Sequence, residues 1–393
     1  MKIAVHFGAG AIGRGLVGEA LHKSGYQIVF VDTNEELIKQ INQNNYYTLI
    51  QMQDQKRIKI DHVEVLHAVA DRKQVADYIE KASVITTSVM VGNLDKIAGV
   101  IGEGLERRWN KKLPLINIMA FENAFRASDK LAEHIRNSNA SLAEHLDETA
   151  RFANTVTDRV VSPVNEDGNS VVVIGKEYEM TVARKELVDY DELPIQGVHY
   201  TDEINACMER KLYIGNGGHC CMGYLGSLKG YTFIDECIAD QKLYSLVRKE
   251  MLEVASVISQ KYGTDKKELE NYVDYMLNRY KQSSNRDYIA RVCRNPIRKL
   301  EENDRLMSPA VNAEKMGIDD SILALTIAAV FCYKDEQDEE SKTIQEYLLK
   351  FGIEKAIEKF TVVNPEMELY KMIIKFYEKI QNGGIWDEIA VSS

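Results

Sequence analysis

The fold is decided by Ile3-Ala4-Val5-His6-Phe7-Gly8-Ala9-Gly10-Ala11-Ile12-Gly13, an apolar strand that runs directly into a glycine-rich turn. A helical stretch follows at once, and a second apolar run, Ile28-Val29-Phe30-Val31, ends in Asp32, 19 residues after Gly13. A strand, a glycine turn, a helix, a second strand and an acidic residue in this order are what a bound dinucleotide requires. The alternative is a glycine turn in an α/β protein that binds nothing, but this turn has the required neighbours on both sides.

Each part of this unit has an expected role toward a dinucleotide. Gly8 permits the tight turn, Gly10 lets the backbone approach the pyrophosphate, and Gly13 lets the helix lie close to the strand. The helix N-terminus offers N–H groups and a partial positive charge to the phosphates. Asp32 would accept hydrogen bonds from the ribose hydroxyls and repel a 2′-phosphate, so NAD is expected rather than NADP. The residues of this unit that we expect to bind the cofactor are Gly8, Ala9, Gly10, Ala11, Ile12, Gly13 and Asp32.

Further cofactor contacts are expected where two later buried strands end. Residues 83–89 and 115–119 are apolar strand candidates, and ligands of doubly wound sheets lie at the carboxyl ends of the strands. This rule points to Thr87, Ser88 and Asn123, of which Asn123 could bond the nicotinamide carboxamide or a ribose. The alternative for each is an ordinary polar loop residue. Arg14, directly after the glycine turn, either touches the cofactor phosphates or is a solvated helix residue.

Composition excludes several classes of partner. The chain has 393 residues, of which 45% are hydrophobic and 28% charged, a normal balance for a globular protein of two domains. A net charge of −11 without a basic tract argues against nucleic acid. No apolar stretch is long enough for a membrane span, and the N-terminal run is a strand rather than a signal peptide. Six cysteines without metal-ligand spacing favour free thiols in the cytoplasm.

The character of the sequence changes near residues 190–200. Before that point continuous apolar strands alternate with helices, which predicts an α/β, Rossmann-like, doubly wound parallel sheet in residues 1–195. Residues 46–50 and 63–66 are expected to form a small antiparallel excursion, and residues 128–151 a helix. Long helical patterns dominate afterwards, so residues 196–393 are expected to form a mainly α-helical domain that binds the substrate.

A chemical constellation opens the second half, in Lys211-Leu212-Tyr213-Ile214-Gly215-Asn216-Gly217-Gly218-His219. On an α-helix, Lys211, Asn216 and His219 lie at about 0°, 140° and 80° around the axis. A desolvated lysine can act as general base, and amide N–H groups can hold a developing alkoxide. Three glycines in one helix cost stability, which suggests close approach to a cofactor, a substrate or another backbone. The alternative is a helix packed on its glycines, with a surface lysine.

These residues resemble a known family. Lys211-x4-Asn216-x2-His219 is similar to the motif of the polyol-specific long-chain dehydrogenases, the zinc-independent mannitol dehydrogenase group. Residues 152–163, Phe-Ala-Asn-Thr-Val-Thr-Asp-Arg-Val-Val-Ser-Pro, resemble the family segment Asn-Ser-x-x-Asp-Arg-Ile-x-Pro. The start of the chain, residues 6–15, and residues 291–305 resemble the bacterial branch that acts on mannitol 1-phosphate. The resemblance covers nearly the whole chain.

The resemblance implies a role for each matching residue. Lys211 corresponds to the general base, Asn154 and Asn216 to the pair that stabilises the oxyanion, and His219 to a residue that orients the substrate. Arg291 and Lys299 correspond to a substrate-binding pair. No metal is implied, because the lysine takes the place of a zinc ion.

The implied reaction is the NAD-dependent, reversible oxidation of D-mannitol 1-phosphate to D-fructose 6-phosphate. A phosphorylated sugar needs bidentate donors, and Arg294, Arg298 or Arg305 could hold the phosphate. The alternative for these arginines is an exposed basic helix face. Alternative functions are a reductase of a related hexuronate or unphosphorylated polyol, and a protein that binds NAD(H) without turnover. A monomer and a dimer are both compatible with the sequence.

Overall fold

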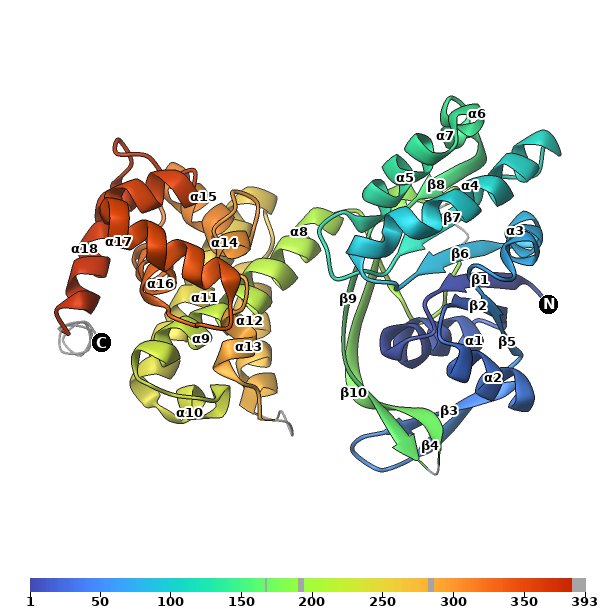
Figure 1. The fold of residues 1–393 in the computed structure, drawn as a ribbon, viewed down its shortest axis with the longest axis horizontal. Coiled ribbons are helices and arrows are strands. Elements are labelled where there is room, and N and C mark those ends of the chain that lie inside the picture. Colours follow the sequence, from blue (N-terminus) through green and yellow to red (C-terminus); the bar gives the residue numbers. More distant parts are fainter. Residues whose placement is uncertain (167, 190–193, 282–285, 384–393) are drawn as a thin grey trace. The chain divides into compact units, whose positions relative to one another are not determined.

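The computed structural model describes residues 1–166, 168–189, 194–281 and 286–383. The chain forms two compact units, Met1–Cys207 and Met208–Ser393, which we call unit 1 and unit 2 (Figure 1). Unit 1 holds the predicted parallel sheet with its helices, and unit 2 is mainly helical, so the predicted fold class is confirmed. Among the described residues, no helix is both long and apolar enough to cross a membrane.

The first sheet of unit 1 is entirely parallel. β1 pairs with β2 on one side and with β6 on the other, so the order of the strands reverses between β1 and β6. Its strands, in the order in which they pair, are β5 (Val63–His67), β2 (Gln27–Asp32), β1 (Ile3–Phe7), β6 (Val84–Thr87), β7 (Ile116–Ala120) and β8 (Ala150–Phe152).

Apolar side chains cover both faces of this sheet, because alternate residues of a strand point to opposite sides. On one face Val5, Val29 and Ile85 belong to a core shared with the helices α3, α4 and α5. On the other face Ala4 and Ile28 belong to a second core. The helical segments of unit 1 are η1 (Gly13–Gly18), α1 (Glu19–Lys23), α2 (Glu35–Asn44), α3 (Arg72–Lys81), η2 (Val91–Asn93), α4 (Leu94–Asn110), α5 (Ala127–Ser138), α6 (Ala140–Ala143), α7 (Leu146–Thr149) and η3 (Arg184–Glu186).

A second, five-stranded sheet corrects one predicted pairing. Residues 46–50 do enter an antiparallel excursion, but their partner is Arg57–Asp61 rather than residues 63–66, which return to the first sheet. The long strand β10 runs parallel to β3 and β11 and antiparallel to β9. The strands of this sheet are β11 (His199–Thr201), β10 (Asn169–Ala183), β3 (Tyr46–Gln51), β4 (Arg57–Asp61) and β9 (Thr155–Glu166).

The predicted helix over residues 128–151 is also wrong in its second half. The helix α5 ends at Ser138, two short helical segments follow, and residues 150–152 form the edge strand β8. Asn139 ends the helix because its backbone is extended and its side chain accepts a hydrogen bond from the Leu142 N–H, which caps the next segment. A residue that caps a new helix cannot continue the previous one.

A buried ion pair joins the helix after the glycine turn to the second sheet. Arg159 on β9 and Glu19 at the start of α1 have side chains that are only 2% and 5% exposed. The guanidinium also donates to the carbonyl oxygens of Gly15 (2.7 Å) and Gly175 (2.8 Å). Because removing one partner would leave the other charge buried and unpaired, this pair fixes how the helix lies on the sheet.

Unit 2 is built around one helix that is apolar on all sides. Ile322–Phe331 of α16 are all buried, as expected for a helix with neighbours all around it. The helix α11 is capped at both ends. Asp240 accepts hydrogen bonds from its first N–H groups, and Gly263 ends it with a φ of +70°. The helix α8 (Ile204–Glu209) begins in unit 1 and ends in unit 2. The other helices of unit 2 are η4 (Arg210–Gly217), α9 (Gly218–Leu228), α10 (Ile234–Ala239), α11 (Gln241–Tyr262), α12 (Lys266–Lys281), α13 (Ile289–Cys293), α14 (Pro296–Lys299), α15 (Met307–Met316), α16 (Ser321–Cys332), α17 (Glu339–Phe360) and α18 (Glu368–Gln381).

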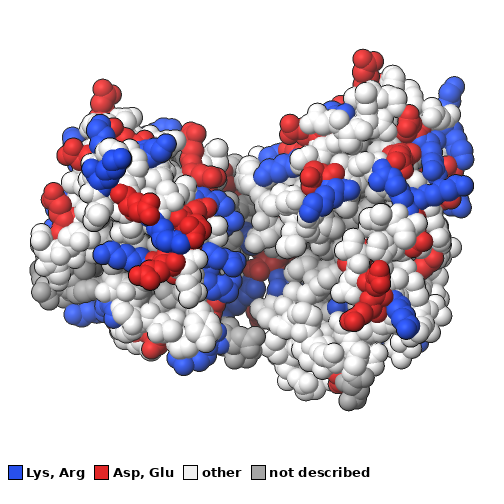
Figure 2. Space-filling view, viewed as in Figure 1, with Lys and Arg blue, Asp and Glu red and all other residues white. Residues whose placement is uncertain are grey.

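Charged side chains of both signs lie intermingled on the surface, as Figure 2 shows for one face. Many form exposed ion pairs between neighbouring helices. Between α3 and α4, Arg72 pairs with Glu103 and Lys111 with Glu80, both at 2.6 Å. Each exposed pair contributes at most about 1 kcal/mol, so these charges chiefly serve solubility.

Candidate active site

The three glycines of the predicted cofactor turn meet different surroundings. Gly8 has a φ of +100°, and a Cβ there would lie 2.5 Å from the Ser88 carbonyl oxygen. A Cβ on Gly13 would lie 1.9 Å from the Gly8 carbonyl oxygen, whereas a Cβ on Gly10 would meet nothing within 4 Å. Gly8 and Gly13 therefore close the turn against the protein, and Gly10 leaves its outer face open to a ligand.

Asp32, the last residue of β2, holds this turn. Its Oδ2 accepts a hydrogen bond from the Ala9 N–H (2.6 Å), and its Oδ1 accepts from the N–H groups of Thr33 (2.7 Å) and Asn34 (3.0 Å). A carboxylate offers about four lone-pair sites, so roughly one remains for a ribose hydroxyl. Two further predicted residues, Ala11 and Ile12, begin the helix that follows the turn, and both are half-buried. An open glycine, a helix N-terminus and this carboxylate fit a dinucleotide.

The alternative of a solvated helix residue is wrong for Arg14, because its side chain is buried within unit 1. The residue is 2% exposed. Its Nε donates to the Ala9 carbonyl oxygen (2.8 Å), and its two terminal nitrogens donate to the carbonyl oxygen (2.8 Å) and hydroxyl (3.0 Å) of Ser170. Arg14 therefore fastens the glycine turn to β10, a partner 156 residues away that the local pattern could not indicate.

Thr87 shapes the carboxyl edge of the sheet together with Glu122, in the segment that follows β7. Its hydroxyl is fully buried and donates to Glu122 Oε1 (2.8 Å). The same carboxylate accepts hydrogen bonds from the N–H groups of Val89 and Met90, both at 2.8 Å. Burial raises the pKa of Glu122, and these three hydrogen bonds counteract that effect. Glu122 therefore fixes the segment that follows β6.

Ser88 and Asn123 lie where the strand rule places them. Ser88 is half-buried, and its Oγ bonds Nε2 of the fully buried His6 (2.9 Å), whose Nδ1 bonds the Thr86 hydroxyl (2.7 Å). Burial lowers the pKa of His6 to about 3, so the ring is neutral near pH 7. Asn123 is exposed in the segment that follows β7. Both predicted cofactor contacts thus belong to the carboxyl edge of the first sheet.

Asn154, a predicted oxyanion donor, lies in a dense polar network of unit 1. Its side-chain N–H groups donate to Asp129 Oδ1 (2.7 Å) and Glu186 Oε2 (2.9 Å), and its Oδ1 accepts from the Ser128 N–H (3.2 Å). Arg126 neutralises both carboxylates. The amide is therefore rigidly oriented. Its two donors are engaged, so an oxyanion would have to replace one carboxylate.

In unit 2 the predicted base stands on a π-helical turn. The segment η4, Arg210–Gly217, has this wider winding, in which hydrogen bonds join residues five apart. Lys211 and Asn216 are five apart, so the π turn brings them closer to one face than the 140° expected from an α-helix. Both side chains are half-buried. Single π turns are frequent at functional sites, and the three glycines were the only signal of one in the sequence.

An aspartate that the sequence analysis missed brings two predicted residues together. Asp287 Oδ2 lies 3.3 Å from His219 Nε2, and the same carboxylate forms a two-pronged pair with Arg291. Burial alone would raise the pKa of Asp287, but the hydrogen bonds from His219 and Arg291 outweigh it and hold the pKa well below its usual range. The His219 ring also stacks on Tyr280, with centroids 5.0 Å apart. Its orientation is therefore fixed from two sides.

Lys299, predicted to bind substrate with Arg291, has its ammonium buried against the backbone. The residue is 2% exposed. Its Nζ donates to the carbonyl oxygens of Val292 (2.8 Å) and Arg294 and lies over the ring of Tyr224. Burial lowers the pKa of Lys299. In this arrangement Lys299 holds the segment between α13 and α14 in shape.

The three arginines considered for the phosphate differ in exposure. Arg294 precedes α14 and Arg298 lies in it, four residues apart, and both are exposed. Arg305 is 15% exposed, and its Nε donates to Asp304 Oδ1 (2.6 Å). Arg294 and Arg298 thus have the accessible guanidinium groups that an anionic substrate requires.

The glycines around Asn216 pack against protein. A Cβ on Gly218 would lie 2.6 Å from Met251 Cγ, and one on Gly217 would lie 3.2 Å from the Arg305 carbonyl oxygen. These glycines let η4 and α9 approach α11 and the segment that precedes α15. The sequence left open whether these glycines approach a cofactor, a substrate or another backbone. In the structure they approach another part of the chain.

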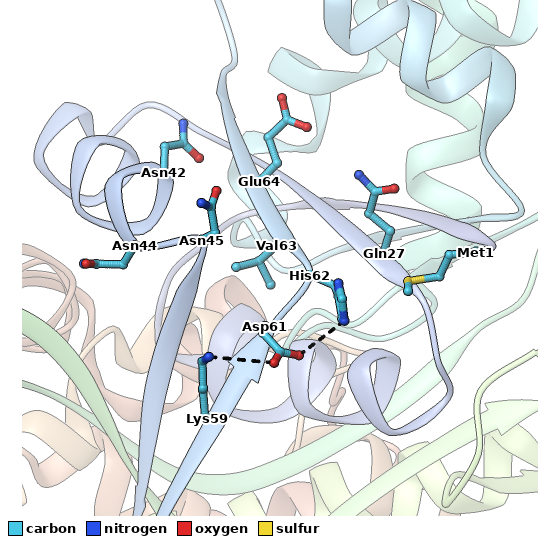
Figure 3. Close-up of a pocket in the computed structure, with 10 residues that line it drawn as sticks. All are labelled: Met1, Gln27, Asn42, Asn44, Asn45, Lys59, Asp61, His62, Val63 and Glu64. Atoms are coloured by element: carbon cyan, nitrogen blue, oxygen red, sulfur yellow. Dashed lines mark ion pairs between the residues drawn. The ribbon is translucent and has the colours of Figure 1, made fainter.

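A polar cavity of about 810 Å³ opens elsewhere on unit 1, at the amino ends of β2 and β5 (Figure 3). None of the predicted site residues lines it, and ligands of doubly wound sheets bind at the opposite edge. Its lining residues are Met1, Gln27, Asn42, Asn44, Asn45, Lys59, Asp61, His62, Val63 and Glu64.

Within the described residues, no three His, Cys, Asp or Glu side chains are grouped as metal ligands.

Two family models match this chain over most of its length. The mannitol dehydrogenase Rossmann domain matches residues 2–197, and the mannitol dehydrogenase C-terminal domain matches residues 203–381. The mannitol-1-phosphate 5-dehydrogenase of Caldanaerobacter subterraneus is 33% identical over 391 residues, covering 97% of this chain and 99% of that protein. The enzyme of the same name from Thermoanaerobacter pseudethanolicus is 35% identical over 386 residues, covering 97% and 98%.

Solved structures show the same fold at low sequence identity. A ternary complex of Pseudomonas fluorescens mannitol 2-dehydrogenase with NAD and D-mannitol has a TM-score of 0.75 and 17% identity, covering 99% of this chain and 94% of that chain. A substrate-free D-sorbitol dehydrogenase has a TM-score of 0.76 and 17% identity, covering 97% and 93%.

Proposed function

Because this chain belongs to the mannitol dehydrogenase family, we propose that it oxidises D-mannitol 1-phosphate to D-fructose 6-phosphate with NAD, reversibly. The observation that carries the proposal is the likeness to two mannitol-1-phosphate 5-dehydrogenases, 33% and 35% identical over nearly the whole chain. The glycine turn and Asp32 of unit 1 support the choice of cofactor, since a carboxylate in that place disfavours the 2′-phosphate of NADP.

The cofactor would be held by the edge of unit 1 already described. The open face of Gly10 and the helix N-terminus would hold the pyrophosphate, and Asp32 the adenosine ribose. Ser88 and Asn123 would hold the nicotinamide half. When bound, the nicotinamide ring supplies the acceptor for a hydride.

Lys211 would take the proton of the substrate's C5 hydroxyl. Asn216 would donate an N–H to the oxygen that becomes negative, and Asn154 would do the same after exchanging a carboxylate partner for this oxygen. His219, oriented by Asp287, would bind a neighbouring hydroxyl. In the reverse direction Lys211 would return the proton to the carbonyl oxygen of fructose 6-phosphate.

The phosphate would be bound by Arg294 and Arg298. Both guanidinium groups are exposed, and each can donate two parallel hydrogen bonds to phosphate oxygens. Arg298 Nε lies 4.0 Å from Asp304 Oδ2, a long ion pair that a phosphate could replace. Arg305, Arg291 and Lys299 have closer partners in Asp304, Asp287 and backbone carbonyls, so these three would shape the site around the first two.

The test is the oxidation of NADH with a panel of carbonyl substrates. We expect turnover with fructose 6-phosphate to exceed that with fructose, fructuronate and tagaturonate by at least about 100-fold in kcat/KM, the value of one desolvated ion pair. Arg298→Ala should raise the KM for fructose 6-phosphate and leave the KM for NADH unchanged. A preference for an unphosphorylated substrate would refute the phosphate site. An absence of turnover with all four would refute the proposed activity.

A further inference from the structure

The segment that follows β6 contains an unfavourable backbone conformation that the predicted roles do not explain. Met90 has a φ of +71° and a ψ of 136°, values that residues other than glycine avoid. Its side chain is 73% exposed although it is large and apolar. The packing of unit 1 therefore gains nothing from a methionine here, and strained backbone of this kind is concentrated at ligand sites.

Hydrogen bonds on both sides hold Met90 in this conformation. Its N–H donates to Glu122 Oε2 (2.8 Å), and its carbonyl oxygen accepts from the Asn93 N–H (2.9 Å). The Asn93 side chain also donates to the Val89 carbonyl oxygen (2.8 Å). The direction of the Met90 side chain is thus set by the fold.

The segment lies against the glycine turn. The Ser88 carbonyl oxygen is so close to Gly8 that a Cβ on Gly8 would lie 2.5 Å from it. The strand order reverses between β1 and β6, and a dinucleotide crosses a doubly wound sheet at that point. With the adenosine ribose on Asp32 at the end of β2, the nicotinamide half must extend toward the end of β6.

We propose that Met90 is a cofactor-contact residue, whose thioether side chain covers an apolar surface of the nicotinamide half of the dinucleotide. The inference rests on the proposed NAD-dependent function. It explains why an exposed apolar side chain stands on strained backbone at the carboxyl edge. The strain is a cost in the free protein that contact with the cofactor offsets.

The experiment is a fluorescence titration of the full-length protein with NADH. Met90→Ala keeps the strained backbone and removes the contact, so the Kd for NADH should rise about 10- to 100-fold, the value of one buried methionine side chain. Met90→Leu should restore most of the affinity. Leu113→Ala, which shortens a 36% exposed leucine of the same unit, should leave it unchanged.

Two further measurements separate contact from structural damage. ADP-ribose lacks the nicotinamide, so its competition with NADH should report equal affinity for the wild type and Met90→Ala. Met90→Gly removes both strain and contact, so it should raise the Tm by about 2–4 °C and still weaken NADH binding. Unchanged NADH affinity in Met90→Ala, or an equal loss for ADP-ribose, would overturn the inference.

The outcomes also distinguish this inference from the proposed function. If the wild type oxidises NADH with fructose 6-phosphate and Met90→Ala binds NADH as tightly as the wild type, only the role of Met90 is refuted. If the wild type binds NADH, loses affinity in Met90→Ala and reduces no substrate of the panel, the role of Met90 is supported and the proposed reaction is refuted.

Discussion

Burial shifts the pKa of a base in unit 1 and the pKa of two acids in unit 2 in opposite directions. Unit 1 buries a base, His6, and burial lowers its pKa to about 3. Unit 2 buries two acids close together on α11; burial raises the pKa of Glu253 to about 8 and that of Glu250 well above its usual range. In each case the low dielectric of the interior selects the neutral form of the group.

The units differ more in how these groups are satisfied. Both ring nitrogens of His6 are hydrogen-bonded, and so are Glu122 and the Asn154 amide. In the described part of the chain, neither carboxyl oxygen of Glu250 has a hydrogen-bond partner. A satisfied polar network is rigid, whereas an unsatisfied buried group reduces stability. Unit 1 thus presents a fixed edge for a ligand, and the buried Glu250 carboxyl group reduces the stability of unit 2.

The largest effect should come from a substitution that removes the predicted base in unit 2 and leaves the cofactor site of unit 1 intact. Lys211→Ala should lower kcat by roughly 10²- to 10⁴-fold, the usual contribution of a general base, because alanine cannot take the proton of the substrate hydroxyl. NADH binding depends on unit 1 and should stay within twofold of the wild type. Lys375→Ala, on the exposed side of α18, serves as the control. Turnover near the wild-type value would contradict the role of Lys211.

The second largest effect should distinguish a glycine that is needed for folding from one that is needed for cofactor binding. Gly13→Ala places a Cβ 1.9 Å from a backbone oxygen, so the protein should unfold at much lower temperature or fail to fold. Gly10→Ala meets open space, so its Tm should match the wild type while its NADH affinity falls at least about tenfold. Thermal unfolding and NADH titration measure the two effects. Unchanged NADH affinity in Gly10→Ala would show that the open face binds no dinucleotide.

A smaller effect should appear as the pH rises toward 8. The pKa of Glu253 is higher in the folded protein, about 8, than in the unfolded chain, about 4.5. The folded state therefore binds more protons in this window, and stability falls as the pH rises through it, by at most about 1.4 kcal/mol per pH unit. Glu253→Gln should flatten the fall in Tm between pH 6 and 8. A wild-type Tm that is constant over that range would contradict the expectation.

The smallest effect should appear on the acid side, in unit 1. The pKa of His6 is lower in the folded protein, about 3, than in the unfolded chain, about 6.5. The unfolded chain binds the extra proton, so the stability is fully present above pH 6.5 and declines as the pH falls below it. His6→Gln, which stays neutral, should show a shallower decline in Tm from pH 6.5 to 5. An identical slope in both proteins would show that His6 is not the titrating group.

The sequence predicted what depends on local order. The strand, glycine turn and Asp32 are consecutive or nearly so, and the long helices of the second half follow from periodicity within each segment. The fold class and the family were therefore predicted correctly. The residues proposed for catalysis and binding follow from the resemblance and stay predictions.

The features that were missed depend on distant partners or on backbone geometry. Arg14 contacts Ser170 across 156 residues, and Asp287 joins His219 to Arg291 from a segment without any motif. The strand β4 alternates charged and apolar residues, a pattern equally common in surface segments. A π turn leaves no periodicity of its own, so the wider winding at Lys211 and Asn216 was not predicted.

The long strand β10 connects two distant parts of unit 1. Near its start Ser170 receives the guanidinium of Arg14, and at its end the Ala183 N–H donates to the Asn154 carbonyl oxygen (2.9 Å). Twelve residues of β10 lie between these anchors, and its pairing with β9 shifts register between Ile174 and Tyr178. Deleting one residue between them would turn every later side chain to the other face and shorten the span. The number of residues in β10 therefore determines how the glycine turn, held through Arg14, and Asn154 are spaced within unit 1.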